Sequence, residues 1–355
     1  MSQLPRARGE VSQLLLDALA GDHAPLPATY LPPSPDALAD EDLQLALYLC
    51  YELHYRGLPG VADEWEWEPS LLALRRELEL QFERELLAVV PLRSQRVEPA
   101  EIDLALRAIA EADEGPSLSN YIQSAATAEQ VREFVVHRSA YQLKEADPHS
   151  WAIPRLAGPP KAALLEIQFD EYGSGRSEWI HAELFAQSMR ALGLDPSYGA
   201  YLDRIPAVTL ATVNLMSWLG LHRRLRAAIV GHLALFEMTS SIPNRRYANG
   251  LRRLGFGPDA TRFFDEHVTA DAVHENIAAV DLAGGLLSQE AESGPLLLWG
   301  AEALDHLEAR WAAHLISGWE NGSSSLLRRA AGGAETSQLV GAVAERLDLR
   351  SAAPA

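Results

Sequence analysis

Residues 259–282 read DATRFFDEHVTADAVHENIAAVDL, and the spacing of this stretch predicts a helix. His267, Asp271 and His274 recur there at positions i, i+4 and i+7, so their side chains project from one face of that helix. The residues between them are mostly small and apolar, which suits a buried helix. A buried face with two imidazoles and a carboxylate needs polar partners, and a metal ion would supply them. The alternative is a surface helix whose polar residues share this spacing.

Four further residues are candidate ligands: Glu145, Glu171, His181 and Glu237. Glu145 closes a helix predicted over 127–146, and Glu237 is a lone acid in an apolar run, where carboxylates are seldom buried without a partner. Glu171 precedes His181 by ten residues, so both share a helical face if one helix continues past Gly175. For each residue taken singly, the alternative is a charge at a helix end or a core carboxylate that is satisfied by other partners.

The kinds of ligand in this set narrow the choice of metal. Structural zinc prefers thiolates, and the chain has a single cysteine, Cys50. Calcium and magnesium avoid imidazole, and a mononuclear iron site needs only two histidines and one carboxylate. Three histidines and four carboxylates suit two iron or manganese ions in a helical bundle, and the four negative charges balance two divalent ions. Glu178, which forms Glu-x-x-His with His181, is a less favoured candidate because no second Glu-x-x-His completes the pattern.

Composition and charge restrict the class of protein. Apolar residues make up 48% of the 355 residues and charged residues 22%, which is enough for an ordinary packed core. The net charge of −19 argues against nucleic acid or an anionic membrane as a main partner, because both require basic patches. No window approaches the roughly 20 apolar residues that span a bilayer. We see no signal peptide and expect a cytoplasmic protein.

The apolar periodicity along the chain predicts an all-α protein, because alternating strand patterns are nearly absent. The expected helices cover 41–57, 69–90, 127–146, 160–192 with a bend near 173–175, 206–240, 243–254 and 259–282. Asp147-Pro148 should end the 127–146 helix, because the residue before a proline avoids helical geometry. The expected regions are an N-terminal helical packing or dimerisation region at 1–98, a catalytic domain at 99–325 and a C-terminal tail at 326–355.

Several other features are interpreted as structural. The chain has no GxxxxGK[ST], GxGxxG, HExxH or GxSxG motif, which leaves the common nucleotide, zinc-protease and serine-hydrolase sites without support. His137, His149, His222 and His232 are expected to be structural or to face solvent.

Residues 238–243 (MTSSIP) are poor helix formers, so we expect segments 237–245 or 267–274 to be mobile when no metal balances the acids.

Taken together, these motifs resemble the haem-oxygenase-like di-iron oxidases and oxygenases, also described as iron-containing redox enzymes. The resemblance covers about residues 100–320 and rests on HRS at 137–139, LKEADPHSWAIP at 143–154, EIQFDEYG at 166–173, HAELF at 181–185 and HVTADAVH at 267–274. It implies a haem-oxygenase-like all-α fold. It also implies iron ligands at Glu145, Glu171, His181, Glu237, His267, Asp271 and His274.

Within that family the sequence is most similar to the N-oxygenating branch. The resemblance implies an enzyme with two Fe²⁺ ions that uses O₂, together with an external electron donor, to oxidise the nitrogen of a small amine or amino-heterocycle to N-hydroxy or nitro. It also implies a homodimer. One alternative is a desaturase or C–C lyase of the same fold that acts on an amino acid or a fatty acid. Another is a metal- or haem-binding helical protein without enzymatic activity.

Overall fold

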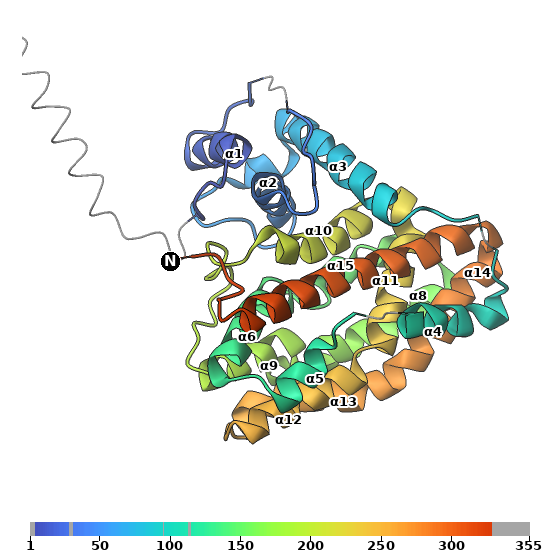
Figure 1. Ribbon diagram of the computed structural model, residues 1–355. Helices are drawn as coiled ribbons and strands as arrows, with labels where there is room; N and C mark the ends of the chain where they lie inside the picture. The colour runs from blue at the N-terminus through green and yellow to red at the C-terminus, as the bar shows by residue number, and fades with distance from the viewer. Residues whose placement is uncertain (1–3, 28–30, 95, 113–114, 329–355) are drawn as a thin grey trace, which may run out of the picture.

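The computed structural model describes residues 4–27, 31–94, 96–112 and 115–328, and it is an assembly of helices (Figure 1). No strand occurs in these residues; their one β contact is an isolated antiparallel bridge between Tyr172 and Ile180. The prediction of an all-α fold is therefore confirmed. Most of the predicted C-terminal tail, residues 329–355, lies outside the described residues.

The N-terminal helices gather on one side of the molecule, above α10 (Figure 1). They are α1 (Glu10–Ala20), α2 (Glu41–Glu52) and α3 (Pro69–Val89), with a 3₁₀ turn at Asp63–Trp67. Helix α2 is almost entirely buried, and the Asp40 side chain caps it by accepting two backbone N–H groups. It ends at Glu52, five residues before the predicted end of the 41–57 helix, because the chain turns towards Gly57, whose φ is 67°. The dimerisation role of residues 1–98 stays a prediction.

The remaining helices form the larger part of the structure, in which α15 runs across the centre (Figure 1). In chain order, they are α4 (Ile102–Ala112), α5 (Leu118–Ser124), α6 (Ala128–Gln142), α7 (Asp147–Ser150), α8 (Gly158–Glu171), α9 (His181–Ala191), α10 (Ala207–Leu221), α11 (Arg226–Met238), α12 (Ser241–Arg253), α13 (Pro258–Asn276), α14 (Gly285–Gln289) and α15 (Gly294–Glu320). A π-helical segment, Ile277–Gly284, continues α13 into α14. Short 3₁₀ turns lie at Pro99–Glu101, Ile153–Arg155, Gly173–Gly175, Ser177–Trp179, Arg223–Leu225 and Ala291–Ser293.

Helices α11 and α15 cross at unusually close range. A Cβ on Gly231 of α11 would collide with the backbone of Leu297, and one on Gly300 of α15 would collide with that of Ala228. Only glycine allows two helix backbones to approach so closely at these points. This contact fixes α11, the helix that carries Glu237, against the longest helix described. Helix α15 was not among the helices predicted from the sequence.

The helix predicted over 127–146 is shorter than expected. Thr127 caps it, in a reciprocal capping box with Gln130. The helix ends at Gln142, however, and a new short helix begins at Asp147. The prediction that Asp147-Pro148 ends the helix is wrong, because proline is also tolerated in the first turn of a helix, and Pro148 occupies that place in α7. Glu145 therefore lies in a turn between two helices.

Three other predicted helices have different bounds. The single bent helix expected over 160–192 is two helices, α8 and α9, separated by left-handed backbone at Gly173, Ser174 and Gly175. The 206–240 helix is likewise two, α10 and α11, divided by a 3₁₀ turn. Helix α12 begins at Ser241, two residues before the predicted start at 243, since Pro243 is accommodated in its first turn. The 259–282 helix continues from α13 into the π-helical segment.

Among the described residues, no helix combines the length and apolar character that crossing a bilayer requires.

Candidate metal centre

The seven side chains singled out in the sequence lie together in the interior. They come from five elements: the turn after α6 supplies Glu145, α8 supplies Glu171, α9 supplies His181, α11 supplies Glu237, and α13 supplies His267, Asp271 and His274. All seven are buried. They form two groups of potential ligands, and in each group one nitrogen or oxygen atom per residue lies within 4.8 Å of the others.

The first group consists of Glu145, Glu171, His181 and His267. The Nδ1 atom of His181 lies 2.8 Å from Oε2 of Glu171. The Nε2 atom of His267 lies 3.5 Å from Oε1 of Glu145. The two imidazole rings are close to each other, with centroids 4.4 Å apart. Two carboxylates and two imidazoles around one point are a ligand set that suits a divalent iron ion.

The second group consists of Glu171, Glu237, Asp271 and His274. The Nδ1 atom of His274 lies 3.4 Å from Glu237, 3.8 Å from Glu171 and 3.8 Å from Asp271, measured to the nearest carboxylate oxygen. Glu171 belongs to both groups, and its two oxygens face different partners: Oε2 faces His181 and Oε1 faces His274. This carboxylate therefore offers one oxygen to each group.

Unsatisfied buried atoms support a cation at this position. Glu145 Oε2, His181 Nδ1, Asp271 Oδ2 and His274 Nδ1 are buried and make no hydrogen bond of good geometry, although the two imidazole nitrogens lie close to carboxylate oxygens. Buried polar groups are almost always paired, so four such atoms around one point call for a missing ligand. The donor set consists of oxygen and imidazole nitrogen, and its four carboxylates would repel one another without a balancing charge. The residues present therefore fit two divalent iron ions.

The crowding of these groups changes their pKa values. Burial together with the charges of Glu237 and Glu171 raises the pKa of Asp271 to about 8, although His267 acts in the opposite direction. Burial alone would lower the pKa of His274, but the carboxylates of Glu237 and Glu171 beside its ring raise that pKa to about 9. Asp271 and His274 must therefore lose protons to bind a metal ion, which couples metal binding to pH.

Outer partners orient two of the histidines. The Nδ1 atom of His267 lies 2.8 Å from the carbonyl oxygen of Phe263, which leaves Nε2 to face the first group. On the opposite side, Nε2 of His274 lies 3.4 Å from Asp170, and the Ser174 hydroxyl donates to the other oxygen of that carboxylate at 2.8 Å. The sequence reading did not identify Asp170. In the sequence, the only feature that pointed to Asp170 was its position directly before Glu171.

The turn between α8 and α9 explains how Glu171 meets His181. The sequence allowed both to share a face if a single helix continued past Gly175, and that condition is not met. The chain instead reverses direction, with Gly173 at φ 71° and Ser174 at φ 52°. A Cβ at Gly173 would collide with the backbone of Trp179 and Ile180, so glycine permits the close return of the chain.

The remaining candidates lie elsewhere. Glu178 is exposed and belongs to neither group. His149 and His232 are buried against each other, with 3.2 Å between Nε2 and Nδ1. His137 is buried between Thr209 and Ser325, and His222 contacts Glu79. These contacts agree with the expected structural roles.

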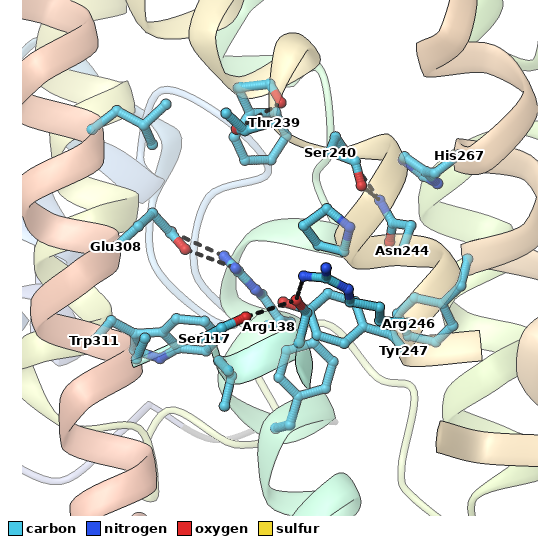
Figure 2. A pocket seen from close by; sticks show the side chains of 18 of the residues that line it. Ser117, Arg138, Thr239, Ser240, Asn244, Arg246, Tyr247, His267, Glu308 and Trp311 are labelled. Carbon is cyan, nitrogen blue, oxygen red and sulfur yellow. Dashed lines mark hydrogen bonds and ion pairs between the residues drawn. The ribbon is translucent and has the colours of Figure 1, made fainter. Parts of the chain in front are cut away.

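A cavity of about 420 Å³ opens next to the first group. Glu145 and His267 form part of its wall, and aromatic side chains line much of the rest: Phe134, Phe185, Phe236, Phe263, Phe264, Tyr247 and Trp311. Figure 2 shows His267 and Ser240 on one side of this cavity and Glu308 with Trp311 on the other. A small molecule in the cavity would therefore contact Glu145 and His267, two members of the first group.

Two arginines of the cavity wall have different surroundings. Arg138 makes a two-pronged ion pair with Glu308, at 3.0 and 2.7 Å, and lies over the ring of Trp311 (Figure 2). Arg246 donates to the Ser119 hydroxyl at 3.3 Å, and within the described part of the chain it forms no ion pair. Glu308 and Trp311 belong to α15, which the sequence reading did not identify.

Comparison with known proteins gives two matches. A family model described as iron-containing redox enzyme matches residues 132–309. A nitrosourea synthase from Streptomyces achromogenes subsp. streptozoticus is 27% identical over 168 residues, which are 47% of this chain and 36% of that relative. The chain thus matches little more than a third of the length of this curated relative.

Proposed function

The chain belongs to the family of iron-containing redox enzymes, and from that premise we propose that it is an O₂-dependent N-oxygenase with two iron ions. Membership of the family confirms the resemblance seen in the sequence and makes the protein an oxidoreductase with a haem-oxygenase-like fold. The observation that carries the proposal is the sharing of Glu171 by two buried ligand groups, one of which opens onto a cavity.

In this proposal each group of ligands would hold one iron ion, and Glu171, which belongs to both groups, would contribute to both. When bound, the two Fe²⁺ ions supply the redox chemistry that activates O₂. The four carboxylates match the charge of two such ions, which explains why so many acids are tolerated in the interior. Phe263 and Asp170 fix the rings of His267 and His274, and thereby keep the ligand geometry ready for metal.

The cavity beside Glu145 and His267 is the proposed substrate site. Its aromatic wall provides stacking surfaces for a small planar or apolar group. Arg246 is the group best placed to hold an anionic part of the substrate, because its charge is not used in an ion pair within the described residues. Arg138 is held by Glu308 and shapes the wall instead.

The proposed class of reaction, oxidation of nitrogen, is inferred from the similarity to the nitrosourea synthase. A nitrosourea synthase is named for a product with oxidised nitrogen, and we infer that this chain also oxidises nitrogen. For the first step, an amine R–NH₂ with O₂, two electrons and two protons gives R–NHOH and water, the electrons coming from an external donor. The nitrogen must offer its lone pair, so we favour a substrate whose reacting nitrogen is neutral.

Isotope labelling tests the proposed reaction. The iron-loaded protein would be supplied with reductant, ¹⁸O₂ and a panel of amino acids, arylamines and amino-heterocycles, and the products analysed by mass spectrometry. We expect label on nitrogen. If turnover gives only alkenes or aldehydes, with no oxygen on nitrogen, the protein is a desaturase or lyase of the same fold. If no substrate is consumed but metal or haem is bound stoichiometrically, a binding protein is the better description.

A further inference from the structure

The turn that carries Glu145, residues 143–146, has a backbone that needs external support. Ala146 has a φ of 71°, in the left-handed region that a residue with a Cβ seldom adopts. Such a conformation persists only where surrounding contacts determine it. The direction of the Glu145 side chain therefore depends on the groups that hold this turn.

A buried ion pair holds the turn from the side of the N-terminal region. The Nζ atom of Lys144 lies 3.1 and 3.4 Å from the two oxygens of Glu52, in α2, and both side chains are only 1% exposed. The ammonium group also lies over the rings of Tyr48 and Tyr55, and Tyr198 donates to Glu52. Lys144 is thus anchored in the N-terminal region, while the next residue, Glu145, faces the metal centre.

Two further hydrogen bonds hold the 143–146 turn. Arg56, four residues after α2, donates to the carbonyl oxygen of Leu143 at 2.9 Å. From the opposite side, Gln168 of α8 donates to the carbonyl oxygen of Ala146 at 3.0 Å. The turn is therefore held between the N-terminal region and α8, the helix that ends in the shared ligand Glu171. Buried, paired groups of this kind allow little alternative placement.

We propose that Lys144, Glu52 and Arg56 are positioning residues for Glu145, which makes α2 part of the machinery of the metal centre. They act through the turn and touch neither substrate nor metal. Of the two proposed metal sites, only the first group contains Glu145, so loss of these contacts should weaken that site and spare the second group. This inference rests on the two-metal function proposed above.

Titration of the full-length metal-free protein with Mn²⁺, followed by the EPR signal of free Mn²⁺, tests the inference without enzyme turnover. The parent protein should bind two ions. K144M and E52Q should weaken one of them about 10- to 100-fold, as loss of an outer partner of a metal ligand does. R56Q should act in the same direction with a smaller effect, because it removes one hydrogen bond to the turn.

Double variants identify which site is weakened. His181 belongs only to the first group, so H181A alone should leave one tight ion, and K144M/H181A should still leave one. Glu237 belongs only to the second group, so K144M/E237A should leave no tight ion. Hydrogen exchange of the metal-free variants should also show faster exchange of amides 143–147 than in the parent.

Controls separate positioning from a general loss of stability. E83Q and R224Q remove an exposed ion pair between α3 and the Arg223–Leu225 turn, away from the 143–146 turn, and should retain both ions. E52M/K144M removes both buried charges, so it avoids the instability of a single unpaired charge and provides a folded test. It too should bind one ion weakly.

Three results would contradict these assignments, and they are distinguishable. Fewer than two ions in the parent protein would overturn the two-metal function itself. Two unchanged ions in both R56Q and E52M/K144M would overturn only the positioning role. Loss of both ions from a folded E52M/K144M variant would show that the contacts do not act on the first group alone.

Discussion

Glu171 and His181 lie 2.8 Å apart, measured between Oε2 and Nδ1, although a complete reversal of the chain separates them. The other carboxylate oxygen of Glu171 faces His274 of α13 at 3.8 Å. One side chain at the end of α8 thus contacts ligands from two other helices. This arrangement makes Glu171 different from every other acid in the centre, because it alone belongs to both groups of ligands.

The first prediction follows from this shared position. E171A should lose both iron ions, whereas E237A should lose one, because Glu237 belongs only to the second group. Anaerobic titration with Fe²⁺ and analysis of bound iron after desalting would measure the difference. E178A serves as the control, since Glu178 is exposed and should be dispensable for metal. Equal loss in E171A and E237A would contradict the shared role of Glu171.

Local spacing was sufficient to place part of the centre from the sequence. His267, Asp271 and His274 lie on one helix, where side-chain direction follows from the helical repeat alone, and the structure indeed turns all three towards the interior. The all-α class followed from the same periodicity. The predicted helix starts at 127 and 69 also agree with the structure, where Thr127 caps α6 and Pro69 is the first residue of α3, because helix starts depend on neighbouring residues.

Features that depend on distant contacts were not predictable in the same way. Glu145 was placed at the end of a helix, but the structure places it in a turn whose backbone is supported by Arg56 and Gln168. The left-handed residues at 173–175 that divide α8 from α9 include Ser174. Serine seldom adopts this backbone conformation, so the sequence gives no indication of it. The pairing of Asp170 with His274 joins segments more than a hundred residues apart.

The second prediction concerns that outer carboxylate. Asp170 accepts from His274 and is itself held by Ser174, so D170A should weaken the iron of the second group about 10- to 100-fold. The iron of the first group should be unaffected. D281A, on the exposed face of the π-helical segment, is the matched control. An unchanged affinity in D170A, measured by competition with a chelator, would show that the His274 ring is fixed by other contacts.

The third prediction concerns order in the metal-free protein. Glu171, Glu237 and Asp271 converge within one group, and their mutual repulsion is relieved by a cation. Segments 237–245 or 267–274 should therefore exchange amide hydrogen faster without iron, with the strongest effect near the break between α11 and α12. Hydrogen–deuterium exchange with and without Fe²⁺ measures this. Equal protection in both states, together with normal iron binding, would mean that the site is preformed.

The fourth prediction is a dependence of stability on pH that arises from two histidines outside both ligand groups. Burial lowers the pKa of His149 to about 4 and that of His232 well below its ordinary value. The unfolded chain therefore takes up more protons than the folded chain as pH falls from 6.5 towards 4, so stability decreases in that window. For His149 alone the loss amounts to roughly 3 kcal/mol. Urea unfolding at pH 7.5 and 5.0 should show a smaller difference in H149Q/H232Q than in the parent; an equal difference would exclude this pair as its source.

The last prediction tests the substrate cavity. Arg246 lies in the wall, where it donates to Ser119 and forms no ion pair within the described residues, and we expect it to hold an anionic group of the substrate. R246M should raise KM about tenfold or more for a carboxylate-bearing substrate, since a charge-assisted hydrogen bond typically contributes about 1.5–3 kcal/mol. The iron content should not change, because Arg246 lies outside both ligand groups. R245M is the matched control, as Arg245 is the adjacent arginine of α12 and is exposed. Steady-state kinetics on the substrate found by ¹⁸O labelling would give the KM of R246M, R245M and the parent, with iron measured in the same samples. If R246M and R245M behave alike while the substrate carries an anionic group, that group is bound elsewhere in the cavity and the assignment of Arg246 is wrong.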